Sequence, residues 1–363
     1  MMTAFRTYAQ RCCRLVAVLL LTACGASERI DTPDEQPLQV VFRLAMENRR
    51  AGSRATWGDD YDPSDPGTEF DNRIRLGSLR TLVFTTGTDA AFVGEVGELE
   101  YRQTAHNLYE FYGTLRIPDT YLKPNAEYRI MVFANCGDAV TAANLGALTY
   151  DRRDAVPDPT DSAKDGYIPM WGVRTVGLEL FAGDRQDIGT IYLLRAVAKI
   201  ELALSEELAA SGCTIAEASL DRCNGRGYCL PTGYGAAADT REIDLEKGAR
   251  PLASLLPAAV AFDRSADGSA ATIYLPEYAA ADGGAASIRV VVDQPTQPVA
   301  TPYAGTIRLG SYAGGKPTGD AVDLLRNHIY RYEITDLGVD EFVLQYTVCD
   351  WEDAQTSGEI LFE

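Results

Sequence analysis

Hydrophobic and polar residues alternate along much of this chain, which is the pattern of half-buried β-strands. The first clear case runs from residue 38 to residue 44, where Leu38, Val40, Phe42 and Leu44 share one face of an extended segment. Similar segments, bounded by turn-forming residues, recur through the first half and predict strands at 78–85, 108–117, 128–133, 175–180 and 188–194. The first half is therefore expected to be rich in β-sheet.

The second half continues the same pattern. Strands are expected at 195–204, 216–220, 271–275, 288–292, 305–309, 328–334, 341–349 and 360–362. The segment 341–349 places Phe342, Leu344, Tyr346 and Val348 on one face. Helical periodicity is almost absent, and residues 139–148 are the best short helix candidate in the first half. These features predict an all-β protein with two tandem β-sandwich domains.

The amino terminus differs from this pattern. Three arginines and no acidic residue precede a short apolar run at 15–21, which small residues follow, as in a secretory signal. The run is too short to cross a bilayer. It ends in Leu-Thr-Ala-Cys-Gly at 21–25, which resembles a bacterial lipobox and implies cleavage before Cys24 and lipidation of its thiol. An ordinary signal with an incidental cysteine is the alternative.

Four segments follow from these observations. Residues 1–23 are expected to be a lipoprotein signal peptide, 24–37 a polar tether, 38–192 the first sandwich and 193–363 the second. The whole chain has 33 basic and 52 acidic residues, and loss of the signal peptide leaves a formal net charge of −22. A body this acidic excludes a nucleic acid partner and is repelled by anionic lipid. We therefore expect the lipid on Cys24, rather than the protein surface, to attach the chain to a membrane.

Five cysteines remain in the lipidated chain apart from Cys24: Cys136, Cys213, Cys223, Cys229 and Cys349. The cluster at 213–229 allows either a local disulfide or free buried thiols. Zinc is disfavoured because the chain has no Cys-x-x-Cys motif. Its two histidines, His106 and His328, lie elsewhere in the sequence and are expected at the surface.

Few motifs in the sequence indicate catalysis or the binding of a phosphate or a metal. The chain has no Gly-x-Ser-x-Gly elbow, and the glycine-rich segment 310–317 has proline where a phosphate-binding loop needs serine or threonine. This segment is better explained as a hairpin. The acidic stretch 59–71 could supply oxygens to calcium but lacks the calcium-loop spacing, which favours a solvated loop. We therefore predict no enzymatic activity, no metal and no cofactor.

Four segments together resemble one family. They are 74–84, then 128–135 with 168–172, then 194–202, and finally 326–334 closing on 348–351. In this order, behind a lipobox, they resemble the fimbrillin family of Bacteroidota pili. The resemblance implies lipoprotein export and two transthyretin-like β-sandwich domains.

The resemblance also implies assembly by strand exchange. In polymerising fimbrillins an arginine-specific protease cuts after the first strand, and a neighbouring subunit supplies a replacement strand. Here the expelled face is Leu38, Val40, Phe42 and Leu44, the candidate cleavage sites are Arg49, Arg50 and Arg54, and the donated face is Phe342, Leu344, Tyr346 and Val348. Each of these two strands could instead remain a core strand of its own domain.

The function implied is that of an adhesive pilus subunit at the outer membrane, whose partners are other subunits and a surface receptor. A non-polymerising pilus anchor, or a surface lipoprotein that binds glycan or protein, is the alternative, because residues 351–353 and the strand at 360–362 follow the proposed donor strand. An exposed platform of Trp57, Trp171 or tyrosines would favour glycan binding. A glycosidase would need two carboxylates facing each other across a cleft.

Overall fold

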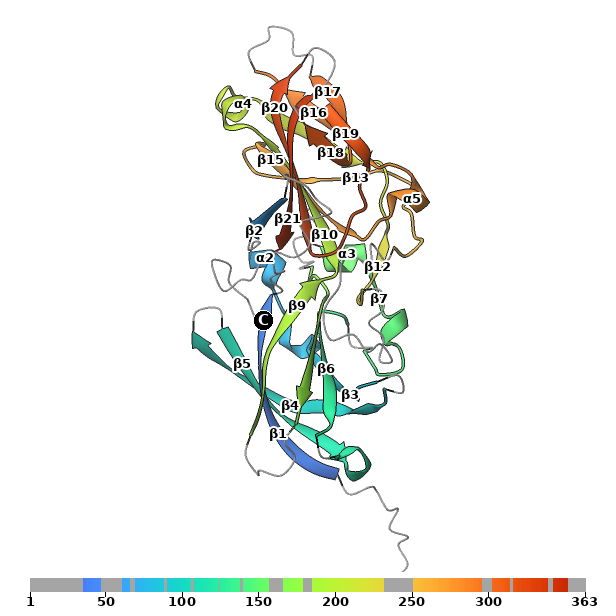
Figure 1. Cartoon of the computed structure of the whole chain (residues 1–363). Coiled ribbons are helices and arrows are strands. Elements are labelled where there is room, and N and C mark those ends of the chain that lie inside the picture. The colour runs from blue at the N-terminus through green and yellow to red at the C-terminus, as the bar shows by residue number, and fades with distance from the viewer. Residues whose placement is uncertain are drawn as a thin grey trace, which may run out of the picture.

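The computed structural model describes residues 35–46, 61–65, 69–87, 90–105, 108–123, 125–137, 140–156, 166–178, 185–231, 251–295, 302–313, 316–338 and 342–351. Strands dominate these residues, and the α-helices among them have four or five residues each. The all-β prediction is therefore confirmed. Figure 1 shows two β-rich bodies one above the other. Most amino-terminal strands lie in the lower body, and the carboxy-terminal strands lie in the upper one together with the strand at residues 61–65.

Seven strands of the first body close into a barrel. Their order is β1 (Glu35–Met46), β5 (Leu108–Pro118), β4 (Phe92–Ala105), β3 (Arg80–Thr85), β6 (Glu127–Ala134), β8 (Met170–Gly177) and β9 (Gln186–Arg195), which pairs again with β1. All neighbours are antiparallel except the parallel pair β1–β9. The sequence predicts a β-sandwich here, whereas these strands close into a ring because β1 pairs with strands on both of its edges.

Two main sheets form the second body. One has the order β14 (Asp263–Arg264), β15 (Ala270–Pro276), β10 (Val197–Leu204), β20 (His328–Leu337), β21 (Phe342–Trp351) and β2 (Tyr61–Asp65). The other has the order β13 (Val260–Ala261), β11 (Thr214–Leu220), β16 (Ser287–Asp293) and β17 (Tyr303–Arg308). The segment expected as a hairpin forms part of the pair β18 (Gly310–Ala313) and β19 (Lys316–Ala321).

Shorter elements connect the two bodies. The strand β7 (Thr149–Asp151) pairs with β12 (Arg226–Tyr228) from the second half of the chain. The short helices are α2 (Glu69–Asn72), α3 (Arg152–Ala155), α4 (Glu206–Ala210) and α5 (Ala280–Gly283), with 3-10 turns at Leu76–Ser78, Asp119–Tyr121 and Leu145–Ala147. Buried apolar residues separate into two cores. The first holds residues from Val40 to Val197 together with Cys229, Leu230, Tyr274 and Ile329, and the second holds other buried apolar residues between Ala198 and Val348. The change of core follows directly after β9.

The stretch 59–71, expected as a solvated loop, contains β2 and most of α2. Two further expectations about secondary structure need correction. The long strand β4 was not predicted, because its register shifts between Gly97 and Glu100 and the positive φ of Glu98 interrupts the alternation. The helix expected at 139–148 is wrong. Over the described residues 140–148 the chain turns, and the backbone N–H of Thr141 donates to the side chain of Asn144. This local hydrogen bond competes with a helix.

Candidate functional site: the groove that holds β1

The strand β1 lies between β5 and β9 and completes the barrel (Figure 1). It runs antiparallel to β5 and parallel to β9. Between Val41 and Phe42 the register with β9 shifts, and Gly189 takes a positive φ of 82° there, which glycine tolerates. We call the slot between β5 and β9 the β1 groove. Without β1, both flanking strands would present an unpaired edge.

The inward face of β1 is apolar, as the alternation predicts. Val40, Phe42 and Leu44 are fully buried, and Leu38 packs against the same core from a partly exposed position. The ring of Phe42 stacks on that of Phe111 in β5, with centroids 5.3 Å apart. Burial of three such side chains contributes roughly 5–9 kcal/mol, an upper value because the unfolded chain already buries part of this surface. Most of the stabilisation of β1 therefore comes from this face.

The outward face of β1 carries an ion-pair network that joins both walls of the groove. Arg43 lies 2.8 Å from Glu110 of β5 and 3.3 Å from Asp187 of β9. Glu110 also accepts hydrogen bonds from Arg102 at 2.8 Å and from the Tyr112 hydroxyl at 2.7 Å. One side chain of β1 thus contacts both neighbouring strands.

This network strongly favours the charged form of Glu110. The hydrogen bond from Tyr112, followed by those from Arg102 and Arg43, lowers the pKa of Glu110 to about 2. In turn the pairing with Asp187 and Glu110 raises the pKa of Arg43. The two walls of the groove therefore present carboxylates to a cation from β1.

The lipidation site and the candidate cleavage sites lie outside the described residues. This holds for Cys24 and for Arg49, Arg50 and Arg54. The three arginines belong to residues 47–60, which join the end of β1 to the start of β2. A cut at any of them would separate β1 from all later strands in the chain.

The proposed donor face lies within its own domain in this structure. Phe342, Leu344, Tyr346 and Val348 alternate into the second core, as the pattern predicts. Their strand β21 is antiparallel to β20 on one edge and parallel to β2 on the other. The structure therefore has β21 as an internal core strand, and its donation to a neighbour remains a prediction.

A buried polar junction was missed by the sequence reasoning. Asp71 of α2, expected in a solvated acidic loop, is fully buried, and its carboxylate lies 3.1 Å from Lys199 of β10. Arg195 donates to the Asp71 carbonyl at 2.8 Å and to the side chain of Asn72. The polar positions at 195 and 199 indicated a half-exposed strand. Here β10 is an internal strand, between β15 and β20, and the α2 segment lies against it.

His328 also differs from the prediction of a surface residue. It is fully buried at the start of β20, and its Nδ1 lies 2.7 Å from the Arg326 carbonyl. His106 lies outside the described residues. Trp171 is buried in the first core, so it forms no exposed platform, and Trp57 is outside the described residues.

Four cysteines whose side chains the structure describes, Cys136, Cys213, Cys223 and Cys229, are buried free thiols. Of the two alternatives left open for the cluster at 213–229, the structure therefore has free thiols rather than a local disulfide. Cys213 and Cys223 belong to the second core and Cys229 to the first. These three cysteines are close in sequence, yet their thiols do not all lie in one core.

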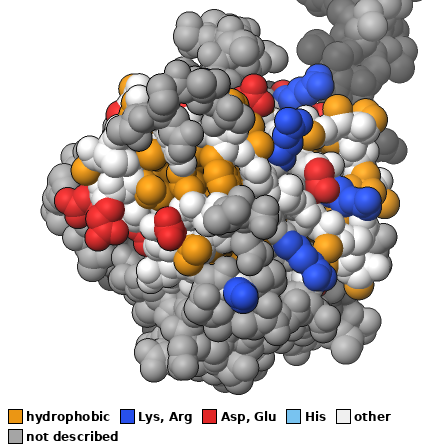
Figure 2. Space-filling view, turned by 90° about the horizontal axis from the view of Figure 1, so that it is seen from above, with side chains coloured by type: hydrophobic (Ala, Val, Ile, Leu, Met, Phe, Trp, Pro, Cys, Tyr) orange, Lys and Arg blue, Asp and Glu red, His pale blue; other side chains and the backbone are white. Residues whose placement is uncertain are grey.

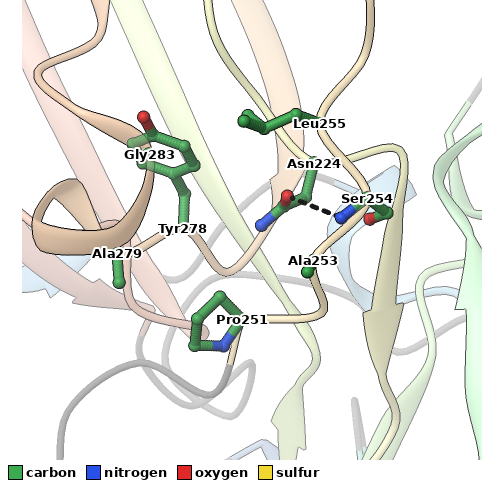
Figure 3. A pocket seen from close by; sticks show the side chains of 8 residues that line it. All are labelled: Asn224, Pro251, Ala253, Ser254, Leu255, Tyr278, Ala279 and Gly283. Atoms are coloured by element: carbon green, nitrogen blue, oxygen red, sulfur yellow. Dashed lines mark hydrogen bonds between the residues drawn. The ribbon is translucent and has the colours of Figure 1, made fainter.

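The hollows on the described surface include two that could hold small molecules. One of about 360 Å³ is lined by the eight residues drawn in Figure 3: Asn224, Pro251, Ala253, Ser254, Leu255, Tyr278, Ala279 and Gly283. Its polar groups already hold the loops together, since Asn224 donates to the Glu277 carbonyl and Tyr278 to the Gly284 carbonyl. The other, of about 560 Å³, lies beside β1 and includes Tyr101, Tyr112 and Arg185.

The rest of the described structure gives few indications of a membrane-spanning helix or a metal site. In the described part of the chain, no helix has the length and apolarity that a membrane crossing requires. Nor do its His, Cys, Asp and Glu side chains form a group of three or more that could hold a metal ion. Figure 2 looks at the molecule from above and shows hydrophobic side chains near the middle of that face, with acidic ones to one side.

No family model and no curated protein sequence matches this chain. Among solved structures it is similar to a fimbrial assembly protein from Parabacteroides distasonis, with 12% identity and a TM-score of 0.47, over 87% of this chain and 97% of that one. A candidate cell adhesion protein from Bacteroides uniformis is 12% identical, with a TM-score of 0.42, over 86% and 99%. A candidate polysaccharide-binding protein from Bacteroides thetaiotaomicron is 11% identical, with a TM-score of 0.34, over 87% and 98%. At these TM-scores the similarity assigns no family to this chain.

Proposed function

We propose that this chain is a fimbrillin-like subunit of a cell-surface pilus, structural rather than catalytic, that joins its neighbours by β-strand exchange and mediates adhesion. The observation that carries the proposal is the position of β1. It completes the barrel between β5 and β9, and it is joined to the next described strand by residues 47–60, which include Arg49, Arg50 and Arg54. Cleavage there would make β1 a separate segment.

The physics of the β1 groove suits strand exchange. Loss of β1 would expose ladder hydrogen-bonding groups on both β5 and β9 and empty the pockets of Val40, Phe42 and Leu44. A strand from a neighbouring subunit could restore both, since backbone bonds fix the incoming strand and alternate side chains fill the pockets. The incoming strand would have to run parallel to β9 and antiparallel to β5, as β1 does.

The remaining chain would keep its own attachments after a cut. The strand β2 pairs with β21, and Asp71 in α2 pairs with Lys199. Both lie after the candidate arginines in sequence. Cleavage would therefore leave β1, together with anything bonded to its amino terminus such as the proposed lipid on Cys24, free to be replaced, while these contacts of the second body stay intact.

Digestion with an arginine-specific protease, followed by size-exclusion chromatography and gel electrophoresis, tests this proposal. We expect wild-type protein to lose residues up to the cut and then to form a ladder of polymers. The matched control replaces Arg49, Arg50 and Arg54 by Lys, which keeps the charge but removes the cleavage sites. This variant should stay uncut and monomeric.

The result that opposes polymerisation is equally clear. A wild-type chain that is cut in residues 47–60 and remains a monomer would favour the alternative of a pilus anchor or non-polymerising surface lipoprotein.

Membrane attachment is tested separately. Labelling with a fatty acid analogue in a bacterial host should mark the wild type and not Cys24→Ser, and labelling of both variants would rule out Cys24 as the lipid site.

One observation favours glycan binding as the second candidate function. The hollow beside β1 brings together Tyr101, which is 48% exposed, with Tyr112 and polar neighbours. Aromatic faces with nearby polar groups are suited to sugars. Binding to a panel of bacterial and host glycans that is lost in Tyr101→Ala would support this function, and unchanged binding would exclude this hollow as the site.

A further inference from the structure

The hollow beside β1 is built from three neighbouring strands and one residue next to a fourth. Gln39 comes from β1, four residues between 98 and 102 come from β4, residues 112–114 come from β5, and Arg185 directly precedes β9. Its volume of about 560 Å³ is within the range of sites that hold small ligands. A strand that the proposed cleavage would detach therefore supplies part of the wall of this hollow.

Gln39 is joined to the other walls of the hollow through Thr114. The Nε2 of Gln39 donates to the Thr114 hydroxyl at 3.0 Å, and this hydroxyl donates to the Glu98 carboxylate at 3.2 Å. These bonds link β1 to β4 across β5, in agreement with the strand register, which pairs Gln39 with Thr114. The side-chain oxygen of Gln39 has no hydrogen-bond partner among the described residues, so it can accept a hydrogen bond from a ligand.

Arg43 provides a second, indirect link between β1 and the hollow. Its pair with Glu110 at 2.8 Å holds a carboxylate that accepts from the Tyr112 hydroxyl at 2.7 Å. Tyr112 lines the hollow, and the guanidinium of Arg185 lies 4.4 Å from the centre of its ring. Arg43 is therefore a positioning residue for the ring of Tyr112, whereas Gln39 can contact a ligand itself.

The charges in the hollow favour a neutral ligand. Two arginines and two glutamates line it. Arg102 is already paired with a carboxylate of β5 at 2.8 Å, which leaves Arg185 against the carboxylates of Glu98 and Glu100. This surplus of negative charge disfavours an acidic sugar, whereas the hydroxyls of a neutral sugar can donate hydrogen bonds to both carboxylates. Tyr101, which is 48% exposed, adds an aromatic surface, and a few polar groups around an aromatic side chain suit a neutral oligosaccharide.

We propose that the hollow binds a neutral oligosaccharide and that the strand in the β1 groove controls this binding, directly through Gln39 and indirectly through Arg43. This regulation presupposes the glycan binding put forward above as the second candidate function. If β21 of a neighbouring subunit replaced β1 with its apolar face inward, its outward residues would be Val343, Gln345 and Thr347. None of these is a cation, so the ion pairs of Arg43 would have no substitute. Exchange of β1 should therefore weaken binding, and the uncut chain is the form that binds glycan.

Titration of the uncut chain tests the role of Gln39. A panel of neutral and acidic oligosaccharides is screened against the wild type, and the neutral oligosaccharide that binds most tightly is then titrated by calorimetry. Gln39→Leu, at an exposed position, should weaken this binding about two- to tenfold, because one hydrogen bond to the sugar is lost. Tyr192→Ala is the matched control, since Tyr192 of β9 is exposed on the same barrel but does not line the hollow. This variant should bind as the wild type does.

The control by β1 is tested on the same wild-type protein after digestion with the arginine-specific protease. Chromatography shows whether the cut chain polymerises and titration shows whether it binds, so pilus assembly and the regulation of glycan binding fail separately. Polymers should bind the same oligosaccharide at least about tenfold more weakly than the uncut chain. A cut chain that stays monomeric would count against the pilus subunit, and Gln39→Leu would then decide the dependence on β1 alone.

Three results would overturn the control of glycan binding by β1. The first is an uncut wild type that binds only acidic oligosaccharides or none of the panel. The second is a folded Gln39→Leu variant that binds as tightly as the wild type. The third is a polymer that keeps the full affinity of the uncut chain.

Discussion

The guanidinium of Arg43 in β1 donates to the carboxylate of Glu110 in β5 at 2.8 Å, and its other side lies 3.3 Å from Asp187 in β9. The same strand buries Phe42 on its opposite face. The apolar face supplies most of the stabilisation, since partly exposed ion pairs contribute only about 0.2–1 kcal/mol each. The role of Arg43 is therefore mainly to fix the position of β1 between its two neighbours.

Replacing Arg43 by Ala should loosen β1 selectively. We expect amide hydrogen exchange across residues 35–46 to become roughly two- to tenfold faster, which corresponds to about 0.4–1.4 kcal/mol of local stability. Exchange is measured by mass spectrometry of peptides from β1. Arg80→Ala is the matched control, because Arg80 pairs with Glu95 between β3 and β4 in the same barrel. Unchanged exchange in β1 of Arg43→Ala would contradict this assignment.

Glu110 should make the groove sensitive to acid. Its hydrogen bonds, first from Tyr112 and then from Arg102 and Arg43, lower its pKa from 4.5 to about 2 in the folded protein. Between these values the unfolded chain binds more protons, so this stabilisation is complete above about pH 4.5 and is lost as the pH falls through about 2. Urea unfolding from pH 6 to pH 2 should show a steeper loss of stability for wild type than for Glu110→Gln. Two parallel curves would show that Glu110 is not the group responsible.

The alternation of apolar and polar residues, together with turn-forming residues, allowed most strands to be predicted. The predicted strands include β1 and β21, whose apolar faces matter for the proposed exchange. The pattern failed at β4, where a bulge at Glu98 breaks the period of two. It also could not predict that β1 closes a ring, because the pairing of Val40 with Gln186 joins residues far apart in sequence. Such pairings depend on tertiary packing rather than on any local pattern.

The buried ion pair and the position of Cys229 could not be predicted from the sequence for the same reason. Lys199 alternates with apolar neighbours as a solvent-facing residue would, yet α2 brings Asp71 to it from 128 positions away. The spacing of Cys213, Cys223 and Cys229 indicated a local cluster, whereas β12 pairs with β7 and Cys229 lies in the first core, apart from the other two. No local signal in the sequence marks either arrangement.

Phe42→Ala should weaken the barrel far more than any change on the outward face. The side chain is fully buried and stacked on Phe111, and loss of a buried Phe side chain typically costs about 3–5 kcal/mol. Urea unfolding, monitored by a probe of the first core such as the fluorescence of Trp171, should show this loss in the free energy of unfolding. Tyr101→Ala, at an exposed position on β4, which pairs with β5, should cost less than about 1 kcal/mol. Equal effects of the two changes would show that β1 is not held by its inward face.

The pair of Lys199 with Asp71 should be much more sensitive to loss of one partner than to loss of both. Lys199 is buried; although burial alone favours its neutral form, the charges of Asp71 and Glu201 raise its pKa, so it remains a cation. Removal of one partner of a buried pair typically costs about 3–5 kcal/mol, because it leaves a charge without compensation. Since Glu201 remains 2.7 Å from Lys199, we expect Asp71→Leu to fall at the lower end of this range.

A double-mutant cycle measures this coupling. Asp71→Leu and Lys199→Met are made singly and together, and the free energy of unfolding is obtained from urea titration of each. The double variant should lose at least about 1 kcal/mol less than the sum of the single losses, because it leaves neither charge buried alone. Glu201→Gln serves as the control at the more exposed end of the network, where Glu201 also pairs with Arg331, and it should cost less than about 1 kcal/mol. Additive losses in the cycle would mean that Asp71 and Lys199 stabilise α2 against β10 independently, and the junction would then be held by Arg195 rather than by this ion pair.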